Sequence, residues 1–302
     1  MDLPVTPILF SLTSSSSSDF WPTEPLLLAV LAPVLVIFLY GLYLWNWGGA
    51  HGKEEAIDTW RRGAVAGLLA ASVFVIPVFV GTAIGIYQQA SNASLNCLSH
   101  LKINKVDPNL ESYTSAVPRA MQCAAQKFDQ AYKRIADTYT NLFQTSTATG
   151  IFAVTGSLSM GLFQIALPFS GAASGALIAL TAAKVAAYVA IAFAALAGLG
   201  AALIATERLQ TLGAVIVAGA MAMPPALAGL ADAVDPSKIP HSEGVLGALG
   251  NLNVFDWGRF VFGTGAVAEI AAYTALALSV MIAATAAVSY ALSKVPQHLS
   301  VE

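Results

Sequence analysis

Long stretches with at most one charged residue dominate the chain and predict where its main elements lie. The longest covers residues 138–206, and Lys184 is the single charged residue within it. Apolar runs of about 18 or more residues indicate membrane spans, because about 20 helical residues cross a hydrocarbon core of roughly 30 Å. This stretch therefore crosses a bilayer at least once.

Six apolar runs are candidate spans, and they predict an all-α protein. They cover residues 26–45, 63–87, 150–169, 172–206, 209–231 and 260–292. The run 150–169 is rich in Gly and Ser and stops at Pro168, so it is either a third span or a re-entrant piece. The run 209–231 is expected to be broken by Pro224-Pro225. We therefore expect a polytopic transmembrane helical bundle of five or six spans. Six spans place the C-terminal tail outside the cell, whereas five spans and a re-entrant piece place it inside.

The charges around the first two spans predict the orientation. No Lys or Arg precedes the first span, whereas Arg61 and Arg62 stand directly before the second. Cytoplasmic loops carry the excess of Lys and Arg. We therefore expect a multi-pass protein of the cell membrane, with the short loop 46–60 in the cytoplasm and the N-terminus outside. Its four parts are an outer N-terminal segment 1–25, the first two spans 26–87, an extracytoplasmic insertion 88–147 and a C-terminal bundle 148–302.

The insertion is too polar to enter a bilayer and is expected to form a helical hairpin. From Pro118 onward, apolar side chains recur at steps of three and four, as on one face of an amphipathic helix. They are Met121, Ala124, Phe128, Tyr132, Ile135, Tyr139 and Leu142. A shorter helical piece, marked by Leu98 and Leu101, precedes a turn at Asp107-Pro108-Asn109. The apolar stripe is expected to pack within the hairpin or on a neighbouring subunit.

The two cysteines of the chain, Cys97 and Cys123, both lie in the insertion. Neither belongs to a Cys-x-x-Cys pair, and the nearby His100 lacks further ligands, so no metal site is expected. A disulfide is expected if the region faces an oxidising compartment, and closing its loop contributes roughly 3 kcal/mol in the entropic model. Asn92 begins the sequon Asn-Ala-Ser and is a candidate glycosylation site, which is useful only on the outer side.

Composition limits the function classes. The chain is 57% hydrophobic and 10% charged, whereas ordinary globular domains are about 25% charged. The net charge of −3 is too small to indicate nucleic acid through bulk electrostatics. The four histidines are scattered, and no phosphate-binding Gly-Lys motif occurs. We therefore expect no enzymatic activity and no cofactor, and an energy-coupled step would need a separate motor.

Lys184 and Glu269 are the two ionisable residues in the predicted spans that are candidates for an intramembrane role. Charges inside a bilayer usually face a bundle interior or a water-filled path. One hypothesis is that the two residues pair or line a hydrophilic passage. The alternative is that Lys184 extends its long side chain toward the surface, and that Glu269 lies at the interface near Arg259.

The basic residues of the insertion are a second candidate site. Lys127, Lys133 and Arg134, with Tyr132 nearby, could contact a nucleic-acid strand through charge and base stacking. Four acidic residues lie in the same insertion. An ordinary solvated helix face is therefore the alternative interpretation.

The order of these parts resembles the polytopic inner-membrane subunit of type IV secretion and conjugation machines, a family that includes the membrane subunit of the archaeal Ced DNA-import system. An outer N-terminus, a short basic-ended loop, a large helical insertion and long Ala/Gly-rich spans follow one another in both. At the level of single residues, the resemblance lies in Arg62-Gly63-Ala64 and in the run from Gly213-Ala214 to Pro224. The resemblance covers most of the chain and is architectural.

This resemblance implies an oligomeric channel or scaffold subunit of a DNA-transfer machine. It implies a homo-oligomer in the lipid bilayer, with pilin-like subunits and a cytoplasmic motor ATPase as partners, and with single-stranded DNA in contact with residues 88–147. Two other classes compete with it. One is a small-solute transporter or channel, with Lys184 and broken helices at Pro77 and Pro224 forming a midplane site. The other is a structural membrane anchor for a surface filament.

Overall fold

The computed structural model describes residues 23–90, 96–101, 110–151, 156–204, 209–239 and 254–299. Within these ranges all regular structure is helical, and the expected all-α class is confirmed. The seven α-helices are α1 (Thr23–Trp47), α2 (Gly49–Ala90), α3 (Leu110–Ile151), α4 (Gly156–Ala195), α5 (Ala197–Ile204), α6 (Gln210–Ala233) and α8 (Val254–Leu299). Two short 3-10 helices accompany them, η1 (Leu98–Leu101) and η3 (Pro236–Lys238).

Five of these helices are long and apolar enough to cross a membrane, namely α1, α2, α4, α6 and α8. The run 150–169 is not a separate element. Instead, α3 extends to Ile151, and α4 begins at Gly156 and continues through Pro168. The expected third span or re-entrant piece is therefore wrong. Proline removes one backbone donor, but it need not end a helix whose flanking turns are held by neighbours.

The prolines inside the other apolar helices do not interrupt them either. The expected break at Pro224-Pro225 is wrong, because α6 is continuous from Gln210 to Ala233. In the same way α2 continues through Pro77. Most of α6 is buried by its neighbours, and this packing supplies the stability that two missing backbone hydrogen bonds remove.

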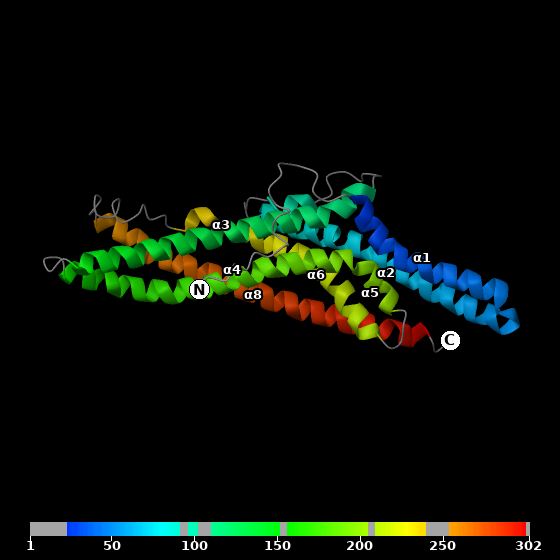
Figure 1. The fold of residues 1–302 in the computed structure, drawn as a ribbon. Coiled ribbons are helices and arrows are strands. Elements are labelled where there is room, and N and C mark those ends of the chain that lie inside the picture. The colour runs from blue at the N-terminus through cyan, green and yellow to red at the C-terminus, as the bar shows by residue number, and fades with distance from the viewer. Residues whose placement is uncertain are drawn as a thin grey trace, which may run out of the picture.

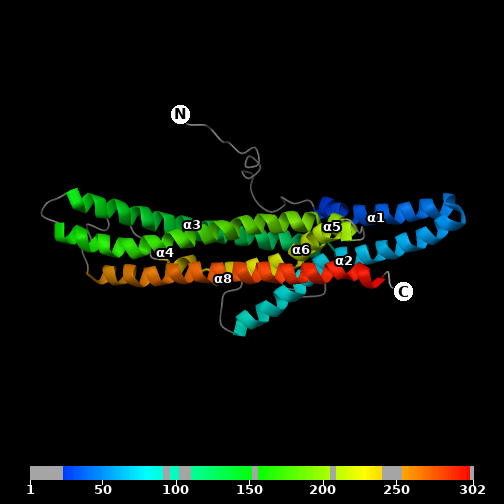
Figure 2. The ribbon, with the colours of Figure 1, turned by 90° about the horizontal axis from the view of Figure 1, so that it is seen from below.

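The molecule is elongated (Figures 1 and 2). The helices α1 and α2 form a hairpin at one end, and α3, α4 and α8 lie side by side toward the other end. Between these two parts, α5 and α6 connect and pack against both. Two buried clusters follow this division, one among α3, α4, α6 and α8 and the other among α1, α2, α5 and α6.

The hairpin of α1 and α2 is more helical than the sequence indicated. Residues 46–60 were expected to be a loop, but the turn is confined to the segment around Gly49, whose φ is +66°. The remaining residues extend α2, because Ala, Glu, Lys and Arg are strong helix formers. Trp60 stacks on Trp45 with ring centroids 5.5 Å apart and donates to the carbonyl of Phe38. The end of the α1–α2 hairpin is therefore a helical extension that contacts between aromatic side chains stabilise.

Among the described residues, the insertion 88–147 comprises the end of α2, η1 and most of α3. The shorter helical piece expected around Leu98 and Leu101 is the 3-10 helix η1. Leu98, Leu101, Met121 and Phe128 are fully or almost fully buried. The stripe of α3 packs mainly along α4, and Tyr132 and Tyr139 stay more than a third exposed.

Candidate functional site: a polar cluster joining α3, α4 and α6

A disulfide connects the two parts of the insertion. Cys97, at the start of η1, is bonded to Cys123 on α3, with the two Cα atoms 5.3 Å apart. The expected disulfide is therefore present. It closes a loop with a sequence separation of 26 residues, so it fixes η1 against the middle of α3.

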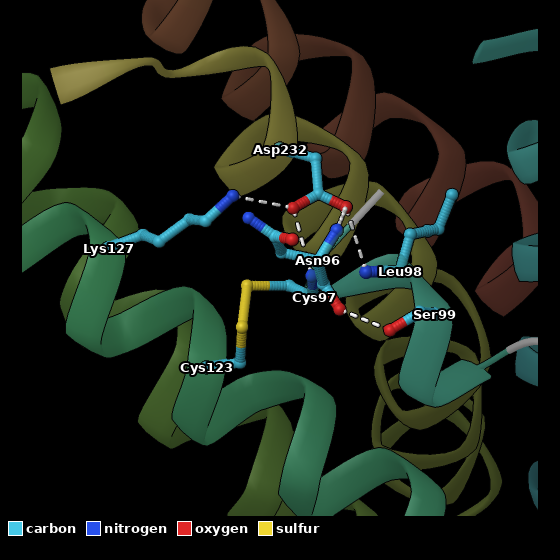
Figure 3. A network of polar contacts seen from close by, with 7 residues as sticks. All are labelled: Asn96, Cys97, Leu98, Ser99, Cys123, Lys127 and Asp232. Atoms are coloured by element: carbon cyan, nitrogen blue, oxygen red, sulfur yellow. Dashed lines mark hydrogen bonds and ion pairs between the residues drawn. A yellow bond between two sulfur atoms is a disulfide. The ribbon is translucent and has the colours of Figure 1, made fainter. Parts of the chain in front are cut away.

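Asp232, near the end of α6, binds the same turn from the other side (Figure 3). Its carboxylate is completely buried. Oδ1 accepts a hydrogen bond of 2.9 Å from the backbone N–H of Cys97, and Oδ2 accepts from the N–H groups of Asn96 and Leu98 at 3.1 and 2.9 Å. Three successive backbone donors thus converge on one carboxylate. A single acidic side chain satisfies the polar groups at the start of η1.

Lys127 of α3 supplies the balancing positive charge. Its Nζ lies 2.8 Å from Oδ1 of Asp232, and its side chain is 17% exposed. Lys127 stands four residues, or about one helical turn, after Cys123 on α3. Disulfide, carboxylate and ammonium therefore form one continuous cluster that ties α3 and η1 to α6 (Figure 3).

A second ion-pair group joins α3 to α4. Lys184 Nζ lies 2.5 Å from Oδ1 of Asp129, and Lys133 Nζ lies 2.9 Å from Oδ2 of the same carboxylate. Hydrogen bonds from Lys133 and then Lys184 lower the pKa of Asp129 below its ordinary value of 3.8. The same carboxylate raises the pKa of Lys133. Asp129 thus favours its ionised form and binds two ammonium groups.

The intramembrane candidates are not brought together. Lys184 pairs with Asp129 of α3 and not with Glu269, whose side chain is exposed on α8. The hypothesis that Lys184 and Glu269 form a pair is therefore wrong. Sequence reasoning missed this partner because Asp129 lies 55 residues earlier in the chain, in a helix whose polar residues were assigned to solvent.

The four candidate nucleic-acid contacts do not share one surface. Lys127 is engaged by Asp232 inside the bundle, and the Nε of Arg134 is buried. Tyr132 is 38% exposed, and the Lys133 side chain is 70% exposed but paired with Asp129. Of the four, Tyr132 and Lys133 are therefore the exposed residues.

Other candidate chemistry is limited in the part of the chain that the structure describes. There, no three side chains of His, Cys, Asp or Glu come close enough to hold a metal ion. The glycosylation candidate Asn92 lies outside the described residues. The cluster of Asp232, Lys127 and the disulfide positions η1, α3 and α6 relative to one another.

These features define a helical protein with five membrane-spanning candidates and a disulfide-bonded insertion packed along them. Comparison with protein-family models, with curated proteins and with solved structures gave no match for the chain. The assignment to multi-pass membrane proteins therefore rests on the helices themselves.

Proposed function

We propose that the chain is a channel or scaffold subunit of a DNA-transfer machine of the type IV secretion or conjugation kind. It works in the cell membrane as a homo-oligomer. Its N-terminus lies outside, and five crossings place its C-terminus in the cytoplasm. The order of parts in the sequence is the basis of this proposal.

One structural observation supports it most, namely the way the insertion is fixed. Asp232 of α6 binds Lys127 of α3, and Lys184 of α4 binds Asp129 of α3. Asp232 also binds η1, which the disulfide fixes to α3. These contacts make α3 a rigid continuation of the bundle rather than a loop that opens and closes. A fixed outward helix suits a subunit that positions other proteins or a passing polymer.

The continuous helices weaken the small-solute alternative. Transporters often bind their substrates at discontinuous helices near the bilayer midplane, where unwound backbone supplies ligands. The two positions expected to supply such breaks, Pro77 and Pro224, lie inside unbroken helices. Lys184 is held by Asp129 in an ion pair. Neither feature of the expected midplane site is present.

The partners follow from the proposal. Pilin-like subunits and a cytoplasmic motor ATPase would assemble with the oligomer, because a phosphate-binding Gly-Lys motif is missing from this sequence. The exposed Tyr132 and Lys133 on α3 are the residues through which single-stranded DNA would be contacted.

A genetic test separates the three classes. DNA transfer between cells is measured in a strain without the gene and in the same strain complemented with the full chain. We expect transfer to be lost and then restored. Unchanged transfer in the deletion strain contradicts the proposal.

Two parallel measurements distinguish the alternatives in the same strains. Surface filaments are counted, because a filament anchor would lose filaments as well as transfer. The purified chain is also reconstituted in vesicles and tested for solute flux. Rapid uptake of a small solute by the chain alone would contradict the DNA-transfer proposal.

A further inference from the structure

We infer that one surface of the bilayer lies at the level of Asp232 and Lys184, so that residues 185–204 cross the lipid and the earlier part of α4 stands outside it. This assigns the lipid-facing part of α4 whatever machine the subunit serves. It also moves Lys184 from the middle of the membrane to its edge.

The two ends of α6 mark a distance that matches a bilayer. At one end, Gln210 donates a hydrogen bond from Nε2 to the carbonyl of Ser293. At the other end, Asp232 accepts from the backbone of η1. Asp232 follows Gln210 by 22 residues with no charge between them, which is about 33 Å at 1.5 Å per residue. A hydrocarbon core is about 30 Å thick.

Two other helices give the same thickness between the same levels. On α2, Arg62 precedes Gly81 by 19 residues, about 28 Å, and Gly81 packs directly against Leu101 of η1. On α8, Glu269 lies 24 residues before Ser293, about 36 Å. Residues 63–87 and 270–293 contain no charge. The ends of the uncharged segments of the three helices thus define two common levels.

The same two levels place α4 and α5. Lys184 binds Asp129, which lies two residues from Lys127, and Lys127 binds Asp232, so Lys184 lies at the Asp232 level. Residues 185–204 follow without a charge. Backbone hydrogen bonds to and from Leu196 carry the helix from α4 into α5. These 20 residues extend about 30 Å and end where Ile204 meets Gly213, near the opposite end of α6.

Hydropathy alone would choose a different part of α4. The part of α4 that qualifies as a span by hydropathy is Leu167–Ala195, whose centre lies close to Lys184. If that part were the span, the antiparallel α3 beside it would carry six charged residues between Arg119 and Asp137 through the same depth. Charged side chains are expensive there. The level of Asp232 lowers this cost, because Asp129, Lys133, Arg134 and Asp137 then lie at or beyond the surface and Lys127 lies next to it. Of the six, Arg119 alone lies deeper.

This placement produces a projection beyond the bilayer. It consists of α3 from Asp129 onward, α4 up to Lys184 and the beginning of α8, which lie side by side in both views (Figures 1 and 2). The 22 residues from Asp129 to Ile151 extend about 33 Å. The lipid therefore covers the half of the molecule nearer the α1–α2 hairpin.

Single-cysteine reporters on α4 test the placement. Ile178 is 72% exposed and lies near the centre of Leu167–Ala195, whereas Leu196 is 45% exposed and lies near the middle of residues 185–204. Ile178→Cys and Leu196→Cys are made in the full chain with the native disulfide intact, and a non-reducing gel confirms that disulfide. A membrane-impermeant maleimide is added to open membrane fragments, so that both surfaces are reached.

The two placements predict opposite results. We expect Ile178→Cys to react at least about tenfold faster than Leu196→Cys, because a thiol must be accessible to water to form the reactive thiolate. Detergent solubilisation should then expose Leu196→Cys. Protection of Ile178→Cys, or labelling of Leu196→Cys in intact membranes, would overturn the placement. If Ile178→Cys does not fold, Thr181→Cys, which is also exposed, replaces it.

Discussion

Asp232 combines the two conditions under which a single carboxylate matters most, complete burial and full use of its hydrogen-bonding capacity. It accepts three backbone N–H groups and pairs with Lys127. Removing one partner of a buried charge pair usually costs more than the pair contributed, because the other partner is left desolvated. The position of η1 and of the disulfide therefore depends on this residue.

Replacing Asp232 with Asn should destabilise the protein by about 3 kcal/mol, since an amide loses the charge and one acceptor facing the three donors and Lys127. Unfolding of the purified chain in detergent micelles, followed by denaturant titration, measures the loss. Asp58→Asn is the matched control. Asp58 pairs with Arg62 one turn away on α2 and is 55% exposed, so its loss should cost less than about 1 kcal/mol. Equal effects of both variants would contradict the burial argument.

Asp129 makes the contact between α3 and α4 sensitive to acid. Its pKa is lower in the folded chain than its ordinary value of 3.8, so the ionised form favours the fold. This stabilisation is complete above the pKa of the unfolded chain and is lost as the pH falls through the lower pKa of the folded chain. We expect the melting temperature to decrease when the pH is lowered below about 4. In the Asp129→Asn variant this decrease of the melting temperature at low pH should disappear. If the variant and the original chain show the same dependence of melting temperature on pH, Asp129 is not its cause.

The residues that sequence reasoning found and missed differ in how local their signals are. Cys97, Cys123 and Lys184 are conspicuous by type in their surroundings, and the sequence indicated all three. Asp232 carries no such local signal, because its donors lie about 135 residues earlier in the chain. The partner of Lys184 was missed for the same reason. Hydropathy shows that a charge needs a partner, but only the packing of α3 on α4 identifies it.

At the scale of elements, three glycines decide how closely the helices approach. A Cβ atom added at Gly198 would lie 1.8 Å from the carbonyl oxygen of Val30 on α1, and one at Gly213 would lie 2.4 Å from that of Gly200. Both obstacles are backbone atoms, which cannot rotate away as a side chain can. Small residues therefore set the contacts of α5 with α1 and α6.

Gly198→Ala should separate α5 from α1 and cost about 1–3 kcal/mol, as overpacking of a buried contact usually does. Gly175→Ala is the control on α4, where an added Cβ meets nothing within 4 Å. That change should be neutral or stabilise by up to about 1 kcal/mol, because alanine favours helix over glycine. Thermal unfolding of both variants gives the comparison. A stable Gly198→Ala protein would contradict the close approach of α5 and α1.

The apolar runs predicted the existence of the elements better than their ends. Residues 26–45, 209–231 and 260–292 correspond to α1, α6 and α8. The expected ends were wrong at prolines that do not end a helix, as at Pro168 and Pro224-Pro225. They were also wrong where polar residues continue a helix, as after Gly49. Proline and charge change the local free energy of a helix, whereas its length depends on tertiary packing that the sequence does not display.

For the whole molecule, the number of crossings decides on which side of the membrane each terminus lies. Five helices qualify as spans among the described residues, and five crossings place the two ends of the chain on opposite sides. The basic residues Arg61 and Arg62, which stand directly before the apolar part of α2, favour an outer N-terminus. The disulfide between Cys97 and Cys123 agrees, because such bonds persist in oxidising compartments.

Epitope tags at the two termini of the full chain test this topology in intact cells. We expect added protease to remove the N-terminal tag and to leave the C-terminal tag until the cells are permeabilised. Cys97 and Cys123 should react with an impermeant maleimide from outside after reduction, and Cys97→Ser with Cys123→Ser serves as the unreactive control. Two tags on the same side would require an even number of crossings, and one of the five helices would then lie outside the bilayer. If the two tags lie on opposite sides of the membrane but the cysteines react only from the cytoplasm, the expected orientation is reversed. The number of five crossings would still hold.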